Sequence, residues 1–561
     1  MKIKLRPWQI EAINKCLSWY SNNQNEPQFI INAAPGSGKT IAACSIAQQL
    51  IEKKEIDRVI IIAPRTEVVN QWSKDYKMIT NLSMSKVTAG DSDISSLDID
   101  ICATWAAIQG LTNILKDICN TKNVLVICDE HHHAALEAAW GISADSAFKN
   151  SKYTLILTGT PIRSDGSKSV WLSYDDIGYI KCSKDACYNL TYGQAVDLGY
   201  CRPCTFHRHE GNFTIADSNG EIIAEISSKK TKIVSNTLRS SKILKKTLDF
   251  YKSARTRRYE KDNITPLKNG YQGTMLDWGS KKLDEIRNIM PDAGGLVIAP
   301  DIEMAEYMAK ILEMIEGEAP VLVHSKMNNS DSRIKIFRES KKRWIVSVAM
   351  VSEGVDIRRL RVLVYLPNAL TNLAFRQAIG RVVRTNGPND DTRAYVVMPS
   401  IKILEGYARK VEDEISPVHK KESKITHKKC PSCHNKCKLS DTKCNNCGHE
   451  FPTKINTRLK NCDNCGHQNT FNADVCVNCG HKFNQNFALT LKEALREGAI
   501  VRGIEVSEEE VRAGERLAKS LKKEMLRQGD DVFVEILKKV PDEAIARFIN
   551  VAETIGNNNE K

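Results

Sequence analysis

APGSGKT, residues 34–40, stands between a short apolar run, QFIIN, and a stretch with a helical pattern. A strand, a glycine-rich turn and a helix in that order place backbone N–H groups at a helix N-terminus, where they bind phosphate. Gly36 and Gly38 let the backbone face phosphate oxygens, Lys39 neutralises their charge and the Thr40 hydroxyl can ligate magnesium. The stretch therefore predicts a site for ATP with Mg2+, against the alternative of a chance glycine-rich turn.

Apolar, β-branched runs recur on both sides of this loop. Runs without alternating polarity are typical of parallel strands that helices cover on both faces. The sequence therefore predicts an α/β fold with two doubly wound parallel-sheet domains in tandem and a cleft between them. The runs are QFIINA, RVIIIA, DICAT, NVLVIC and KYTLILT between residues 28 and 160, and GGLVIA, PVLVHS, RWIVSVA, RVLVYL and RAYVVM between residues 294 and 398.

Two acids end one of these runs, in the stretch CDEHHH at residues 128–133. Ligands of open α/β sheets bind at the carboxyl ends of the strands. Asp129 can hold magnesium there, and Glu130 can orient and deprotonate the water that attacks the γ-phosphate. Neighbouring side chains point to different sides, so a three-histidine metal site is disfavoured. We expect His132 to form a hydrogen bond that links the nucleotide site to the second domain.

A pair of arginines lies in the second set of runs, within QAIGRVVR at residues 377–384. Arg381 and Arg384 carry fixed cationic forks that can stabilise charge on a transferred phosphoryl group. If the first domain holds the phosphates and the second offers the arginines, hydrolysis requires the cleft to close. The alternative is a pair of arginines on a helix surface.

Eight cysteines form a duplicated pattern in the C-terminal part. Each copy has two Cys-x2-Cys pairs separated by ten residues, and the second copy repeats the first after 32 residues. Two such pairs supply four thiolates, so the pattern predicts two structural Zn2+ ribbons, with a redox dithiol as the alternative. The predicted ligands are Cys430, Cys433, Cys444 and Cys447 in the first ribbon and Cys462, Cys465, Cys476 and Cys479 in the second.

The other cysteines carry a weaker signal. Cys437 lies outside the repeat and reads as a spare thiol. Cys182, Cys187, Cys201 and Cys204 have irregular spacing, so buried thiols are favoured over a third zinc site.

The chain has 561 residues and a net charge of +13. Between Ser228 and Asn288, 16 Lys and Arg face 6 Asp and Glu, so +10 of the charge lies in one segment. This favours a nucleic-acid partner, with Arg255, Arg257 and Arg258 as candidate phosphate contacts, over a solvated charged face. No apolar run reaches the ~18 residues of a membrane span, and no signal peptide is evident, so we expect no membrane partner and a cytoplasmic location.

Together these motifs resemble the superfamily 2 helicases and translocases of the DExH type over about residues 1–400. LRPWQ at residues 5–9 is similar to their adenine-reading motif, which implies that Gln9 contacts the base and that Arg6 supports it. APRTEVVNQW from residue 63 and ATWAAIQ from residue 103 are similar to segments that follow the nucleic-acid backbone. That similarity implies contacts from Pro64, Arg65 and Thr104.

The remaining motifs extend the resemblance. TGTPIR, residues 158–163, resembles the coupling motif, which implies that role for Thr158 and Thr160, although Gly159 replaces the usual alanine. AMVSEGVDI, residues 349–357, resembles the nucleotide-sensing motif. By the same match the nucleotide is also contacted from the second domain by Gly354, Asp356, Gln377, Arg381 and Arg384.

The order of motor and cysteine module also resembles the RadD-type bacterial DNA-repair helicases. That resemblance implies an ATP-dependent role in repair or recombination, with DNA favoured over RNA. Two rivals stay open: the motor subunit of a restriction or defence complex, and a nucleic-acid-binding scaffold that does not hydrolyse ATP. We expect RecA-like domains at 1–205 and 291–412, basic linkers at 206–290 and 413–429, zinc ribbons at 430–451 and 462–483, and a helical tail at 487–561.

Overall fold

The computed structural model describes residues 4–451 with gaps, and four short pieces beyond them. The gaps are 24–25, 89–98, 131–138, 160–170, 175–179, 182, 184, 217–221, 235–247, 328, 349–355, 386–389, 391, 417–426, 431, 434 and 439–440; the later pieces are 459–461, 468–470, 477–478 and 486–490.

The first domain is built on a seven-stranded, all-parallel sheet. In sheet order its strands are β3 (Met84–Val87), β4 (Asp100–Thr104), β2 (Arg58–Ala63), β5 (Val124–Asp129), β6 (Tyr153–Thr158), β1 (Gln28–Ala33) and β9 (Cys187–Leu190). Its helices are α1 (Pro7–Asn22), α2 (Lys39–Glu52), α3 (Thr66–Thr80), α4 (Trp105–Thr121), α5 (Ala139–Phe148) and α6 (Tyr192–Asp197). A short antiparallel pair, β7 (Ser173–Tyr174) and β8 (Ile180–Lys181), accompanies them.

Helices cover both faces of this sheet. On one face, residues of α1, α2 and α3 such as Trp8, Ala42 and Trp72 belong to the same core as the strand residues. On the other face, Leu111 of α4 and Phe148 of α5 pack in a separate core. Burial on both faces explains why these strands read as continuous apolar runs.

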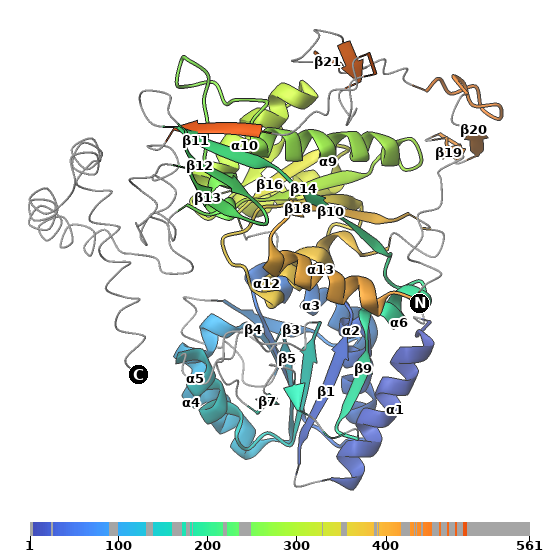
Figure 1. The fold of residues 1–561 in the computed structure, drawn as a ribbon. Helices are drawn as coiled ribbons and strands as arrows, with labels where there is room; N and C mark the ends of the chain where they lie inside the picture. The colour runs from blue at the N-terminus through green and yellow to red at the C-terminus, as the bar shows by residue number, and fades with distance from the viewer. Residues whose placement is uncertain are drawn as a thin grey trace, which may run out of the picture.

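The second domain has a six-stranded sheet, also all parallel. Its strand order is β10 (Cys204–His209), β18 (Ala394–Pro399), β17 (Leu360–Tyr365), β14 (Gly294–Ile298), β16 (Trp344–Ser347) and β15 (Val321–Val323). Its helices are α8 (Phe250–Ala254), α9 (Tyr271–Arg287), α10 (Ile302–Glu316), α11 (Ser330–Glu339), α12 (Asn372–Val382) and α13 (Lys402–Glu414). Figure 1 shows α12 and α13 between the two sheets. The predicted pair of α/β domains is therefore confirmed.

Residues 206–290 differ from the linker that the sequence predicts. Strand β10 joins the second sheet as its edge, and α9 packs on that domain through Met275, Leu276 and Leu283. The strand was not predicted because CTFHRH alternates between buried and half-exposed positions, as an edge strand does, and has no apolar run.

A small accessory sheet completes the second domain. Its order is β13 (Thr231–Ile233), β12 (Ile222–Ser227), β11 (Asn212–Ala216) and β23 (Asn486–Thr490). Strand β23 opens the segment predicted as a helical tail, and it pairs in parallel with β11. Phe487 lies among Phe213, Tyr271 and Leu489 in the core of this part. The chain therefore returns to the second domain after the cysteine modules, and the remainder of the tail lies outside the described residues.

Two short antiparallel pairs belong to the cysteine region: β19 (His427–Lys429) with β20 (Lys436–Lys438), and β21 (Leu459–Asn461) with β22 (Gln468–Thr470). Across the residues with described structure, no helix combines the length and apolar character needed to span a membrane.

Candidate nucleotide site and metal centre

The glycine-rich loop joins β1 to α2 in the form that phosphate binding requires. Gly36 and Gly38 adopt φ values of +78° and +97°, which side chains rarely tolerate. Lys39 Nζ donates to the Ala33 carbonyl at 2.8 Å, so the side chain folds back over the loop. Burial lowers the pKa of Lys39, while the Glu130 and Asp129 carboxylates oppose that shift. The loop presents backbone N–H groups, a lysine and the helix N-terminus together, which suits a nucleotide phosphate.

Arg6 and Gln9 lie directly on this loop, from the start of α1. Gln9 Nε2 donates to the Gly38 carbonyl at 2.9 Å, and Arg6 Nη1 donates to the Ser37 carbonyl at 2.7 Å. The guanidinium carbon of Arg6 lies 4.4 Å from the ring centroid of Tyr200. The structure thus brings both predicted adenine-site residues to the phosphate loop and adds an aromatic side chain, Tyr200, that no motif indicated.

The two acids lie at the end of β5. Trp72 Nε1 donates to Asp129 Oδ2 at 2.8 Å, and Trp105 Nε1 donates to the Asp129 carbonyl at 3.2 Å. Burial and the neighbouring Glu130 carboxylate raise the pKa of Asp129 to about 6. Glu130 follows in the left-handed region, with φ of 50°, a costly conformation for a residue with a side chain. An acid held in this way fits a site where Mg2+ would supply the compensating charge and polarise phosphate oxygens.

The coupling segment lies between these two groups because β6 is the strand between β5 and β1. Thr158 ends β6 and is 2% exposed. A Cβ on Gly159 would lie 3.0 Å from Lys39 Nζ, so glycine leaves room for the lysine where relatives of this motif carry alanine. Thr160 and His132, the other predicted coupling residues, lie outside the described residues.

Arg384 reaches the phosphate loop from the second domain. Its Cγ would lie 3.0 Å from a Cβ built on Gly36, and its charge acts on the pKa of Lys39. Arg384 Nη1 donates to Asp356 Oδ1 at 2.8 Å. Burial would raise the pKa of Asp356, but the Arg384 and Arg358 guanidinium groups outweigh it and lower that pKa. Arg384 therefore contacts the phosphate loop of the first domain, and Asp356 pairs with Arg384.

Of the other predicted residues of the second domain, two are described by the structure and one is not. Gln377 and Arg381 lie on α12, and Arg381 is 7% exposed. Gly354 lies outside the described residues. A cavity of about 350 Å3 opens between the domains, with Pro35 and Gly159 on one side and Arg376 and Gly380 on the other.

The predicted nucleic-acid contacts of the first domain lie at the carboxyl ends of two neighbouring strands, β2 and β4. Pro64 and Arg65 follow β2, and Thr104 ends the neighbouring strand β4. Thr104 is 4% exposed and its hydroxyl accepts from the Ala107 N–H at 3.3 Å as the N-cap of α4. Its side chain is thus occupied in the helix cap, whereas Pro64 and Arg65 are partly exposed.

Two arginines of the basic segment pair with acids elsewhere in the second domain. Arg255 Nη2 lies 3.6 Å from Asp301, and Arg257 Nη1 lies 2.5 Å from Glu303. Tyr307 Oη donates to the Arg258 carbonyl at 2.8 Å, which ties this loop to α10. These pairs fix the loop on the second domain, so we do not extend the phosphate-contact prediction to Arg255 and Arg257.

The first cysteine module has the geometry of a metal site. The sulfur atoms of its four predicted ligands all lie within 4.8 Å of one another, with 3.4 Å between Cys430 and Cys447 and 3.5 Å between Cys433 and Cys444. Zinc with Zn–S distances of about 2.3 Å requires sulfurs roughly 3.8 Å apart, so the four thiols fit Zn2+. Cys437 lies beside them, 3.6 Å from Cys444 Sγ, outside the group of four.

The structure describes three of the four irregularly spaced cysteines, Cys187, Cys201 and Cys204. Cys201 and Cys204 are buried, and Cys201 Sγ donates to the Pro35 carbonyl at 3.2 Å. Among the described residues, only the module at 430–447 groups three or more side chains that could hold a metal. Cys187 is disulfide-bonded, so the prediction of a buried thiol is wrong for this residue. The ligands of the second ribbon, Cys462, Cys465, Cys476 and Cys479, lie outside the described residues, as does Cys182.

Comparisons with known proteins agree with this geometry. Residues 2–163 match the family described as type III restriction enzyme, res subunit, and residues 281–386 match the helicase conserved C-terminal domain. The first α/β domain is thus similar to the res subunit of type III restriction enzymes, and the second is similar to the C-terminal domain of helicases.

The chain is similar to several particular proteins. An uncharacterized protein of Mycobacterium tuberculosis is 31% identical over 411 residues, which are 73% of this chain and 63% of that protein. The endonuclease subunit of the Escherichia coli type I restriction enzyme EcoAI is 29% identical over 161 residues, 28% of this chain and 19% of that subunit. A fragment structure of a putative HsdR subunit from Vibrio vulnificus has a TM-score of 0.48 at 15% identity, over 75% of this chain and 67% of the fragment.

Proposed function

We propose that this protein is an ATP-dependent nucleic-acid translocase or helicase that acts on DNA. The observation that carries the proposal is the convergence of four charged groups from two domains. Lys39, Asp129 and Glu130 meet at the carboxyl ends of β1 and β5, the strands on either side of β6, and Arg384 reaches them across the cleft. A site divided in this way links phosphate chemistry to the relative position of the domains.

Each residue has a distinct part in this proposal. Lys39 and Thr40 hold the phosphates and the magnesium ion, and Asp129 supports that ion. Glu130 accepts the proton of the attacking water. Arg381, on α12, and Arg384, just beyond the end of that helix, stabilise charge that develops on the transferred phosphoryl group. Because neither domain carries the whole set, turnover requires closure of the cleft.

The DNA-binding surface in this proposal runs past Pro64 and Arg65 and continues onto the zinc ribbons. Small domains that a bound metal ion stabilises can bind nucleic acid or protein partners. Lysines flank the first four-cysteine group, and lysine side chains can contact phosphates. We place the protein in DNA repair or recombination, the role that the resemblance to RadD-type helicases supports.

A second candidate function is the motor subunit of a restriction complex. The match to the res-subunit family and the similarity to the EcoAI subunit favour it. Purification from the native host under mild conditions separates the two: a nuclease that co-purifies in a fixed ratio supports a restriction motor, and a protein that purifies alone supports a repair role.

Hydrolysis is expected to be slow in the isolated protein and to rise with nucleic acid, because the bound strand helps to close the cleft and bring Arg381 and Arg384 to the phosphates. Steady-state ATP hydrolysis with single-stranded DNA, duplex DNA, forked DNA and RNA as activators tests this. We expect a DNA to activate by at least ~10-fold and RNA to activate less. Equal rates with and without every nucleic acid would contradict the proposal.

A further inference from the structure

The chain passes from the first domain to the second through residues 199–203, between α6 and β10. This crossover pairs with the end of α12: Cys201 and Arg384 form an antiparallel bridge, and Thr385 Oγ1 donates to the Tyr200 carbonyl at 3.3 Å. Cys201 Sγ also donates to the Pro35 carbonyl in the phosphate loop. One short segment thus contacts both the phosphate loop and the residues just beyond the end of α12, including Arg384.

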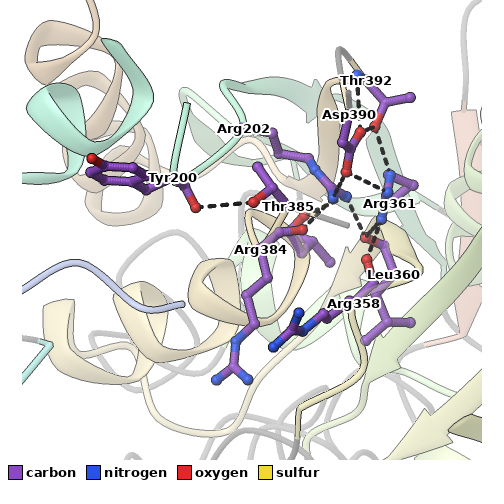
Figure 2. A network of polar contacts seen from close by, with 10 residues as sticks. Tyr200, Arg202, Arg358, Leu360, Arg361, Arg384, Thr385, Asp390 and Thr392 are labelled. Carbon is purple, nitrogen blue, oxygen red and sulfur yellow. Dashed lines mark hydrogen bonds and ion pairs between the residues drawn. The ribbon is translucent and has the colours of Figure 1, made fainter. Parts of the chain in front are cut away.

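Arg202, in the same segment, makes further contacts with the end of α12. Its side chain is fully buried. Its backbone N–H donates to the Val383 carbonyl at 2.7 Å, and its guanidinium donates to the carbonyls of Val382 and Arg384. A further bond to the Leu360 carbonyl, at 2.9 Å, ties the same guanidinium to β17 (Figure 2). Arg202 therefore holds three consecutive carbonyls at the C-terminal end of α12.

Asp390 balances this buried charge and shares it with a second arginine. Arg202 Nη2 lies 2.5 Å and Arg361 Nη2 lies 2.8 Å from Asp390 Oδ2. Asp390 Oδ1 accepts from the Thr392 N–H at 3.1 Å and from its hydroxyl. Figure 2 shows the carboxylate between the two guanidinium groups. Burial lowers the pKa of Arg202 to about 10 and that of Arg361 to about 9, while Asp390 opposes both shifts.

The last carbonyls of a helix have no partner within the helix, and a cation at that end is favourable. Arg202 supplies both the donors and the charge from a segment that also touches the phosphate loop. Because the Arg384 carbonyl is one of the three that Arg202 holds, the backbone of Arg384 can move relative to Gly36 only if these bonds shift as well. Misplacing a catalytic group by about 1 Å can reduce the rate by about 100-fold.

We propose that Arg202, supported by Asp390, is a positioning residue that sets Arg381 and Arg384 against the phosphate loop when the domains close. This inference rests on the proposed ATPase function. It adds a residue outside the helicase motifs, and it assigns the interdomain crossover to the catalytic cycle. The contacts of the Arg202 side chain are to Asp390, to the end of α12 and to β17, so it acts through Arg381 and Arg384.

The test compares Arg202→Lys, Asp390→Asn and the control Arg208→Lys in the full-length protein. Lysine keeps the charge of Arg202 but cannot donate to Asp390 and three carbonyls together. Arg208 lies on β10, pairs with Glu412 at 2.9 Å and is 31% exposed, so a lysine there can keep its ion pair. With DNA present, kcat for ATP should fall about 10- to 100-fold for Arg202→Lys, less for Asp390→Asn and not at all for Arg208→Lys.

The KM for ATP and the affinity for a fluorescent ATP analogue should stay within about 3-fold of the parent, because the phosphate loop is unchanged. A folded Arg202→Lys protein with parental kcat would overturn the inference, and so would a raised KM at unchanged kcat. Loss of the folded state in both network variants would also overturn it, since the network would then serve the fold of the second domain. A parent protein without ATPase activity would instead refute the proposed function itself.

Discussion

Glu130→Gln is expected to bind ATP with parental affinity and to hydrolyse it at least ~100-fold more slowly. The amide keeps the size of the side chain but cannot accept the proton of the attacking water. Binding should persist because Lys39, Thr40 and Asp129 are unchanged. The measurement is single-turnover hydrolysis with DNA present, together with equilibrium binding of a fluorescent ATP analogue.

Glu11→Gln is the matched control for this substitution. Glu11 lies on α1 and accepts a hydrogen bond from Tyr188 Oη at 2.9 Å, which glutamine can also accept. Its hydrolysis rate should equal that of the parent. Normal turnover by Glu130→Gln would remove the water-activating role from this residue. Absence of hydrolysis in the parent would instead favour a nucleic-acid-binding scaffold.

Cys444→Ser is expected to lower the zinc content from two ions per chain to one. Cys444 is 3% exposed at the centre of its module, and a closed four-thiolate site loses its metal when one ligand is removed. The second repeat has its own four cysteines and should retain its ion. Elemental analysis after gel filtration in mild chelator gives the stoichiometry, and nucleotide binding should be unchanged because the motor domains have separate cores.

Cys437→Ser tests whether the fifth thiol of the module is a ligand. Its sulfur is close to Cys444 but lies outside the group of four, so this variant should keep both ions. The predicted ligand set would be contradicted if Cys437→Ser lost one ion, or if Cys444→Ser still contained two ions. A protein that ends near Lys420 should contain no zinc, and zinc retained there would establish a site in the motor domains.

The central strands of both domains could be predicted from the sequence because each is buried on both faces and therefore reads as an apolar run. The edge strands β9 and β10 could not, since their exposed positions break that pattern. Strand β23 is a stronger case: FALT carries no signal that it pairs with β11, about 270 residues earlier. Pairing of that range depends on tertiary packing around Phe213 and Phe487, which no local pattern records.

The candidate site divides in the same way. Lys39, Asp129 and Glu130 belong to short motifs whose residue types indicate phosphate and magnesium binding, and the structure places them together. Arg255 and Arg257 show the limit of charge counting, because the acids that neutralise them, Asp301 and Glu303, lie on a different element. Arg202 and Tyr200 lie in LTYGQAVDLGYCRP, residues 190–203, which is similar to a segment of RadD-type helicases, but that similarity implied no role for either residue. Their position at the interdomain crossover is the feature that distinguishes them.

The most direct test of the central claim, that ATP hydrolysis in this cleft drives movement along DNA, is triplex displacement. A labelled third strand is bound to duplex DNA, and its release is followed after addition of protein and ATP. We expect release that requires ATP and is lost with Glu130→Gln and with a non-hydrolysable analogue. Vigorous DNA-activated hydrolysis without release on duplex substrates of any length, or from single-stranded tracks in the corresponding streptavidin-displacement assay, would contradict the claim.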